Sequence, residues 1–355
     1  MRYFLVLLIS VFFYSGAVGY NPNDPLAVYV KDGKWHFINH SGKEMFEPKE
    51  VVEYGGYGEG LFRLKMRIDG KERWIFLDST GKKMVMPDGD EIMMYSDGLA
   101  LSAVKTADTV YDYMFGFVDK AGNTVIPHKY IDASYFEKGL AWARTFDTLG
   151  YIDRKGKFVI TFDSLVGNAF CEGLAAVNDF NYRMGYIDTT GKVVIPVVYD
   201  EVNPFSEGKA FFHDDGWGGY MDKTGKIIIS PRFEDGRPFS ENYAFAGSFW
   251  IDKIILWAVI DTTGKLITKF RFESVRNFSE GIAAVAKDRS WGFINYKGDY
   301  VIPSQFSSAG SFKNGIAWAS VPFKRYGFID TKGNYIFEIP KPEKVFDVRF
   351  GEQVF

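Results

Sequence analysis

The chain has 355 residues, and with 46% hydrophobic residues it carries too much apolar surface for a disordered chain. Its 42 Lys and Arg residues against 45 Asp and Glu residues give a net charge of −3, without the basic excess expected of a nucleic-acid-binding protein. Its one cysteine, Cys171, excludes an intrachain disulfide framework and any paired-cysteine zinc or redox motif.

The chain begins with the layout of a secretory signal. Arg2 supplies a positive charge, residues 4–13 form a largely apolar core, and residues 15–19 are small. A membrane-spanning helix needs about 20 apolar residues, so this run is too short to be an anchor. We therefore expect residues 1–19 to be removed, leaving an exported bacterial protein, periplasmic or secreted, that does not span a membrane.

The rest of the chain repeats with a period of about 35 residues. The first repeated motif is aromatic-Ile-Asp-x-x-Gly, and its glycines fall at Gly42, Gly81, Gly122, Gly156, Gly191, Gly225, Gly264, Gly298 and Gly333. The second motif is Phe-Ser-Glu-Gly-Leu-Ala, as in Phe278-Ser-Glu-Gly-Ile-Ala283. Length variation is confined to the segment between the second motif and the next turn glycine, as stacked units with one tolerant loop would produce.

The first motif has the chemistry of a tight hairpin turn. Its Asp can accept hydrogen bonds from N–H groups two or three residues on, and its Gly can adopt a positive φ. A repeated acidic loop could also bind calcium, but such a loop needs several carboxylates and each of these turns holds at most one. We therefore predict a structural turn, with no metal and no cofactor.

Each unit also supplies short apolar segments that predict strands. Val-Ile-Pro, as at 125–127 and 194–196, predicts a strand that ends at its proline. The Gly-Leu-Ala-Ala-Val segment predicts a third strand. Since no helical periodicity persists, the units are expected to be three-stranded β-meanders.

The predicted fold is therefore all-β, a tandem array of about nine three-stranded β-meander repeats over residues 20–334. We favour an open solenoid or superhelix, because propeller blades typically have four strands in rings of four to eight. Closure as a β-propeller is the alternative. Residues 335–355 lack the turn motif and are expected to form a C-terminal cap over the exposed end.

These motifs resemble the WG repeat, also called KWG, found in many bacterial proteins. The Gly-Tyr/Phe-Ile-Asp-x-x-Gly and Phe-Ser-Glu-Gly-Leu-Ala cores match over almost the entire mature chain. The name-giving pair is intact only at Trp291-Gly292 and is shifted at Trp217-Gly218-Gly219. The resemblance implies an all-β repeat protein that serves as an interaction module.

The sequence offers little catalytic chemistry. His36 and His40 would meet on a helix, but they lie across a predicted strand and its turn. Cys171 occupies the place of Ser206 and Ser279 in the second motif, so it is interpreted as a repeat substitution. The Glu beside it recurs in most units and is interpreted as structural. We therefore expect no enzyme activity.

Three of the variable segments are long, spanning residues 63–73, 105–115 and 247–257. If the units stack regularly, these loops project on one side, where repeat proteins commonly carry a binding surface. Tyr111, Tyr113, Phe249 and Trp250 lie in them outside the core positions and are the candidate binding residues. The alternative is that these are longer hairpins whose aromatics pack on neighbours.

The leading hypothesis is an exported, non-enzymatic repeat scaffold that binds a protein or peptide partner. The alternative is a module that binds cell-wall glycan, because exposed aromatic rings stack on sugars. A hydrolase with an unrecognised site is a third hypothesis. Nucleic acid is excluded as a partner on charge.

Overall fold

The computed structural model describes residues 25–82, 89–107, 111–249, 254–321, 323–340, 342–347 and 352–353. The predicted signal, residues 1–19, lies outside these ranges. All regular elements within them are β-strands, so the all-β repeat prediction is confirmed. No helix in the described ranges has the length and apolar character needed to cross a membrane.

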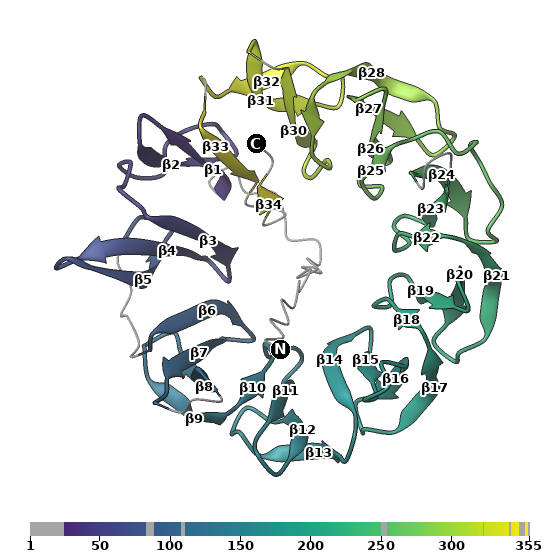
Figure 1. Ribbon diagram of the computed structural model, residues 1–355. Coiled ribbons are helices and arrows are strands. Elements are labelled where there is room, and N and C mark those ends of the chain that lie inside the picture. The colour runs from purple at the N-terminus through teal and green to yellow at the C-terminus, as the bar shows by residue number, and fades with distance from the viewer. Residues whose placement is uncertain are drawn as a thin grey trace.

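The strands form nine sheets arranged as blades around a central axis, so the chain is a closed nine-bladed β-propeller (Figure 1). The closed alternative is the observed one, and the favoured open solenoid is wrong. Nine blades exceed the usual four to eight.

Blades 2 to 9 follow one another along the chain, and each is built from its inner strand outwards. Blade 2 contains β3 (Glu53–Gly58), β4 (Leu61–Ile68) and β5 (Lys71–Asp78), and blade 3 contains β6 (Glu91–Ser96), β7 (Leu99–Lys105), β8 (Tyr113–Asp119) and β9 (Thr124–Tyr130). Blade 4 contains β10 (Asp132–Ala133), β11 (Ala141–Arg144), β12 (Leu149–Ile152) and β13 (Phe158–Phe162), and blade 5 contains β14 (Val166–Cys171), β15 (Leu174–Asn178), β16 (Met184–Asp188) and β17 (Val193–Tyr199). Blade 6 contains β18 (Glu201–Val202), β19 (Lys209–Asp214), β20 (Trp217–Asp222) and β21 (Ile227–Phe233), and blade 7 contains β22 (Asp235–Gly236), β23 (Tyr243–Phe249) and β24 (Ile255–Asp261). Blade 8 contains β25 (Ser274–Val275), β26 (Ile282–Lys287), β27 (Ser290–Asn295) and β28 (Tyr300–Phe306), and blade 9 contains β29 (Ser308–Ala309), β30 (Ile316–Val321), β31 (Arg325–Asp330) and β32 (Tyr335–Glu338).

Blade 1 combines the two ends of the described chain and closes the ring. It contains β1 (Pro25–Lys31) and β2 (Lys34–Asn39) with β33 (Lys344–Asp347) and β34 (Glu352–Gln353). β33 pairs antiparallel with β1, with Val28 opposite Phe346. Residues 335–355 were expected to cap an open end, but a closed ring has no such end. Their described part instead completes blade 9 through β32 and blade 1 through β33.

Most blades have four strands rather than the predicted three, because the innermost strand is often only two residues long and leaves no sequence pattern. The outer strands also do not end at proline. β9 runs through Pro127 and β17 through Pro196. An outer strand has a free edge, where the missing proline N–H breaks no ladder, and proline there discourages pairing with another chain.

The turn glycine of the first motif has a second role between blades. A Cβ on Gly191 would lie 2.5 Å from Ile160 Cγ2 of the preceding blade, in addition to the positive φ of 87° at Gly191. The equivalent glycine packs just as closely where the propeller closes, since a Cβ on Gly42 of blade 1 would lie 2.5 Å from the aromatic side chain of Phe337 in blade 9. Glycine is therefore needed both for the turn and for close packing of neighbouring blades.

The tyrosine of the first motif also connects neighbouring blades. In blades 4, 5 and 6 its buried hydroxyl donates to a backbone carbonyl of the next blade, at Tyr151–Asn168 (2.6 Å), Tyr186–Asn203 (2.5 Å) and Tyr220–Arg237 (2.8 Å). Burying the ring while its hydroxyl is satisfied gives apolar stabilisation without an unpaired donor. Much of the aromatic content therefore belongs to the core.

Ring closure can be tested at Val345, which is fully buried in the core shared by blades 1 and 9. Val345→Asp places an unpaired carboxylate in this core and should lower the free energy of unfolding by about 3 kcal/mol or more. The matched control is Ile336→Asp on the exposed side of β32, which should cost less than about 1 kcal/mol. Equal effects of the two variants in chemical denaturation would contradict closure through β33.

Candidate functional site

Strand connectivity gives the ring two different faces. The turns from inner to second strand and from third to outer strand lie on one face, which we call the turn face. The hairpins from second to third strand, and the connections from one blade to the next, lie on the other, which we call the hairpin face. The two repeated motifs form the turn face, and the length-variable segments form the hairpin face.

On the turn face, the acidic residue of the second motif binds the next blade. It adopts a positive φ, which directs its carboxylate to the backbone N–H groups of the equivalent turn in the following blade. These bonds are Glu59 to Gly98 (3.0 Å), Asp97 to Gly139 (2.7 Å), Glu172 to Gly208 (3.0 Å), Glu207 to Glu241 and Asn242 (2.6 and 2.9 Å), Glu241 to Glu280 and Gly281 (2.7 and 2.9 Å), and Glu280 to Asn314 and Gly315 (2.5 and 2.8 Å). Hydrogen bonds to a charged acceptor are the stronger class, so each carboxylate fastens one blade to the next.

The serine of the same motif forms a second row of bonds between blades. Its hydroxyl donates to the carbonyl of the motif phenylalanine in the following blade, as in Ser96–Phe136 (2.6 Å), Ser206–Phe239 (2.7 Å), Ser240–Phe278 (2.7 Å) and Ser279–Phe312 (2.6 Å). Cys171 makes the same contact through its thiol, to Phe205 at 3.1 Å. Burial raises the pKa of Cys171, which disfavours the reactive thiolate. The interpretation of Cys171 as a repeat substitution agrees with this geometry.

The aspartate of the first motif organises its own turn. Asp188 Oδ1 accepts from the N–H groups of Thr190 and Lys192, two and four residues on, rather than two and three. Asn39 and Asn295 make the same pair of bonds in blades 1 and 8. Where threonine lies two residues after the aspartate, its hydroxyl donates to the same oxygen, and this bond holds the pKa of Asp188 below its usual value of 3.8. The repeated carboxylates of the turn face are therefore engaged in structure.

In the part of the chain that the structure describes, the histidines do not belong to a metal-binding cluster. His36 Nδ1 lies 2.7 Å from Glu44 Oε1 and its ring stacks on Tyr29. Within the described ranges, no three His, Cys, Asp or Glu side chains come together as metal coordination would require.

One histidine lies beside a potential nucleophile. His128 Nε2 is 3.0 Å from Ser102 Oγ, and burial lowers the pKa of His128. Ser102 is completely buried between strands, so a substrate has no access to its hydroxyl. The pair stabilises blade 3 and does not form a catalytic site.

The predicted long loops are largely extensions of strands. Residues 63–73 continue β4 and β5 and turn tightly at Asp69-Gly70. Tyr113 starts β8 opposite Lys105, and Tyr111 makes an edge contact with Phe146 of the neighbouring blade, with ring centroids 5.5 Å apart. Phe249 ends β23 opposite Ile255, while its side chain and the whole of Trp250 lie outside the described part.

Most exposed aromatics of the described ranges lie on the hairpin face, and Tyr300, at the turn-face end of β28, is the exception. Phe146 of blade 4 is 65% exposed, Phe180 and Tyr182 of blade 5 are 65% and 80% exposed, and Trp217 of blade 6 is 49% exposed. Phe323 of blade 9 is 96% exposed. Sequence reasoning missed these residues because their hairpins have ordinary lengths. We call the side chains of Tyr111, Phe146, Phe180, Tyr182 and Trp217, which span blades 3 to 6, the aromatic row.

Two of these residues adopt an unfavourable backbone conformation. Tyr182 has φ +63° and Phe323 has φ +58°, a region that bulky residues rarely occupy. Each costs roughly 1 kcal/mol relative to glycine, and neither buries its ring in return. Both hairpins therefore present an exposed aromatic ring at a small cost in stability.

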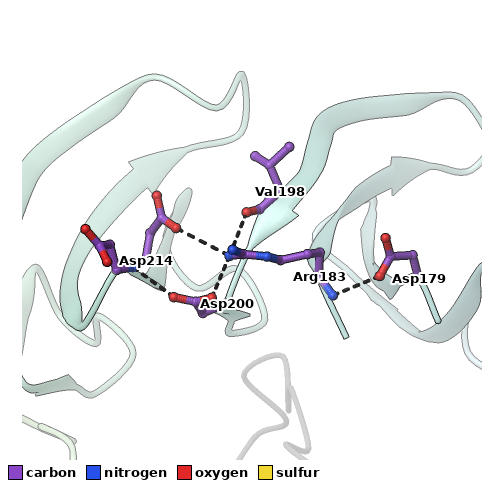
Figure 2. A network of polar contacts seen from close by, with 6 residues as sticks. Asp179, Arg183, Val198, Asp200 and Asp214 are labelled. Carbon is purple, nitrogen blue, oxygen red and sulfur yellow. Dashed lines mark hydrogen bonds and ion pairs between the residues drawn. The ribbon is translucent and has the colours of Figure 1, made fainter. Parts of the chain in front are cut away.

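A network of polar contacts fixes the base of the row between blades 5 and 6 (Figure 2). Arg183 Nη1 donates to Asp200 Oδ1 at 2.5 Å and to the Val198 carbonyl at 3.1 Å, and lies 3.7 Å from Asp214. Asp179 accepts from the Arg183 N–H, and Asp200 also accepts from the Asp215 N–H. The hairpins that carry Tyr182 and Trp217 are thus held in a defined relative position.

The family of the chain follows from its repeats. The WG-containing repeat matches residues 115–145, 150–179, 184–216, 219–246, 257–289 and 291–321, which together exceed half of the chain. The chain belongs to the WG-repeat family. Each matched segment starts in the third strand of one blade and ends in the second strand or the hairpin of the next, so WG repeats and blades are offset. No curated protein matches the sequence.

One solved structure supports the fold alone. A crystal structure of the eukaryotic initiation factor matches 91% of this chain and 98% of its own, with a TM-score of 0.64 at 10% identity. BamB from Moraxella catarrhalis matches 87% of this chain and 89% of its own, with a TM-score of 0.42 at 14% identity.

The lowered pKa of the turn aspartates predicts that the protein loses stability in acid. A folded-state pKa below the unfolded value means that the folded turn binds fewer protons, so its stabilisation is present above about pH 4 and lost as the pH falls through the folded pKa. Asp188→Asn with Asp222→Asn, which copies Asn39 and Asn295, should reduce the fall in Tm between about pH 5 and pH 3.

The control for this experiment is Asp147→Asn with Asp163→Asn, which removes two exposed carboxylates outside the turns. Thermal denaturation should show an unchanged acid response in the control. An acid response of the turn variant that equals that of the wild type would contradict the assignment.

Proposed function

We propose that this WG-repeat protein is an exported, non-enzymatic scaffold that binds a protein or peptide partner through the hairpin face of blades 3 to 6. The observation that carries the proposal is the aromatic row, in which Phe146, Phe180, Tyr182 and Trp217 are exposed on the consecutive hairpins of blades 4 to 6. The turn face is the less suitable surface, because its repeated side chains are bonded to neighbouring blades.

The row has the composition of a protein-binding surface. Tyr, Trp and Arg dominate interface hot spots, because aromatic rings bury large areas at a low entropy cost. Arg183 already has carboxylate partners, so it contributes rigidity rather than a free charge. A surface whose hairpins are fixed before binding loses less entropy on association.

Export and the lack of enzyme activity are part of the proposal. Export is supported by the signal-like residues 1–19. A non-enzymatic role is supported by the burial of Ser102 and the structural use of Cys171 and Glu172.

The second candidate is binding to cell-wall glycan, which the exposure of Trp217 and Tyr182 favours. Aromatic faces that are open to solvent can stack on sugar rings. The aromatic row extends across several blades and is not confined to a surface the size of one sugar ring. An extended polypeptide therefore fits the row better than a glycan. The experiment below separates the two ligands.

The test compares a hairpin-face variant with a rim variant. Tyr182→Gly combined with Trp217→Ala removes two rings of the row, and the glycine relieves the positive φ at position 182, so the fold should keep its stability. Val159→Ala with Ile227→Ala removes comparably exposed side chains from outer strands. We expect at least about tenfold weaker partner binding for the first variant and no change for the second.

Binding is measured by photo-crosslinking from position 180 in the source organism, with position 159 as the control site. A crosslinked protein that is specific to position 180, and lost with Trp217→Ala, supports the proposal. Equal crosslinking from both positions contradicts it. Co-sedimentation with peptidoglycan that is lost with Trp217→Ala would support the glycan candidate instead.

A further inference from the structure

The hairpin face around the aromatic row has an uneven distribution of charge. Carboxylates recur where each blade connects to the next and in the hairpins themselves. In blades 4 to 7 they are Asp132, Asp147, Asp163, Asp179, Asp200, Glu201, Asp214, Asp215, Glu234 and Asp235. We call this set the acidic sector.

Few positive charges accompany these carboxylates. In the described hairpins of blades 4 to 6, Arg144 and Arg183 are the basic residues, and Arg183 is already paired with Asp200. Arg232 is directed to the turn face, where it donates to the Gly264 carbonyl. Within the described ranges, Asp163, Glu201 and Glu234 form no ion pair.

The negative charge is local and does not reflect the whole protein. The net charge of the chain is only −3, and the hairpin of blade 2 is instead rich in Lys and Arg, with Lys65, Arg67, Lys71 and Arg73. On the turn face, repeated carboxylates are satisfied by backbone N–H groups of the next blade. The acidic sector differs because several of its carboxylates remain exposed to solvent beside exposed aromatic rings.

We infer that the partner presents a basic segment, rich in Lys and Arg, which lies along the aromatic row with its charges over the acidic sector. This inference rests on the proposed function and specifies the partner's chemistry. Lys and Arg heads would pair with Asp163, Glu201 and Glu234, while their apolar stems and cationic groups lie against the rings of Tyr182 and Trp217. An acidic segment would meet like charge along the whole sector and is rejected.

The test uses an array of synthetic 12-residue peptides of random sequence, probed with the labelled full-length mature protein. Bound peptides should be enriched in Lys and Arg about threefold or more over unbound ones, and a rise in ionic strength should reduce the enrichment. The variant Asp163→Asn with Glu201→Gln and Glu234→Gln should lose the enrichment. Asp163 and Glu201 are exposed, Glu234 is half-buried, and all three lie outside the cores, so the variant should fold normally.

The matched control removes three carboxylates elsewhere, with Glu50→Gln, Asp69→Asn and Glu72→Gln, and should keep the preference for basic peptides. Bound peptides without a Lys and Arg excess would overturn this inference and leave the proposed function standing. A basic preference that survives in the acidic-sector variant would also overturn it. No bound peptide at all, together with no crosslink from position 180, would overturn both.

Discussion

The fold depends on hydrogen bonds from the side chains of one blade to the backbone of the next. A carboxylate such as Glu207 reaches two N–H groups of the following turn, and Ser206 beside it reaches a carbonyl of the same turn. Backbone N–H and C=O groups are present whatever the sequence of the neighbouring blade. The same motif can therefore hydrogen-bond each blade to the next without a matching side chain there. The same requirement explains why the motif residues recur and why they are a poor place to look for activity.

Closure of the ring follows from the offset between repeats and blades. Because each repeat starts in one blade and ends in the next, a tandem array leaves an incomplete blade at each end of the chain. Pairing of β1 with β33 joins the two incomplete blades into one complete blade, and it buries Val345 between blades 1 and 9. An open array would instead expose the edge of β1, which is a hazard for aggregation.

The local structure could be predicted from the sequence, and the arrangement of the blades could not. The Asp-x-x-Gly turns, the paired glycines and the variable hairpin all follow from chemistry within a few residues. The choice between solenoid and propeller depended on contacts such as Val28 with Phe346, which are distant in sequence. The prolines of the outer strands predicted that these strands end there, because a residue such as Pro127 has no N–H to donate to a neighbouring strand. An outer strand has no further neighbour, so it continues through the proline.

Candidate binding residues were sought in long loops, whereas Phe180 and Tyr182 lie in the short segment Asp179-Phe-Asn-Tyr-Arg183, where polar turn residues would be usual. Large aromatics at such turn positions were the available signal.

The repeated motif residues hold the blades together, and in our proposal this leaves the hairpin face for recognition. Hydrogen exchange at the amides of Glu241 and Asn242 tests it most directly, because these amides lie in an exposed turn and bond to the Glu207 carboxylate of the preceding blade. We predict slow exchange in the wild-type protein and exchange at least about tenfold faster in Glu207→Ala, with the equivalent amides at 280 and 281 unaffected. Fast exchange at 241 and 242 in the wild type, or no change in the variant, would contradict the claim.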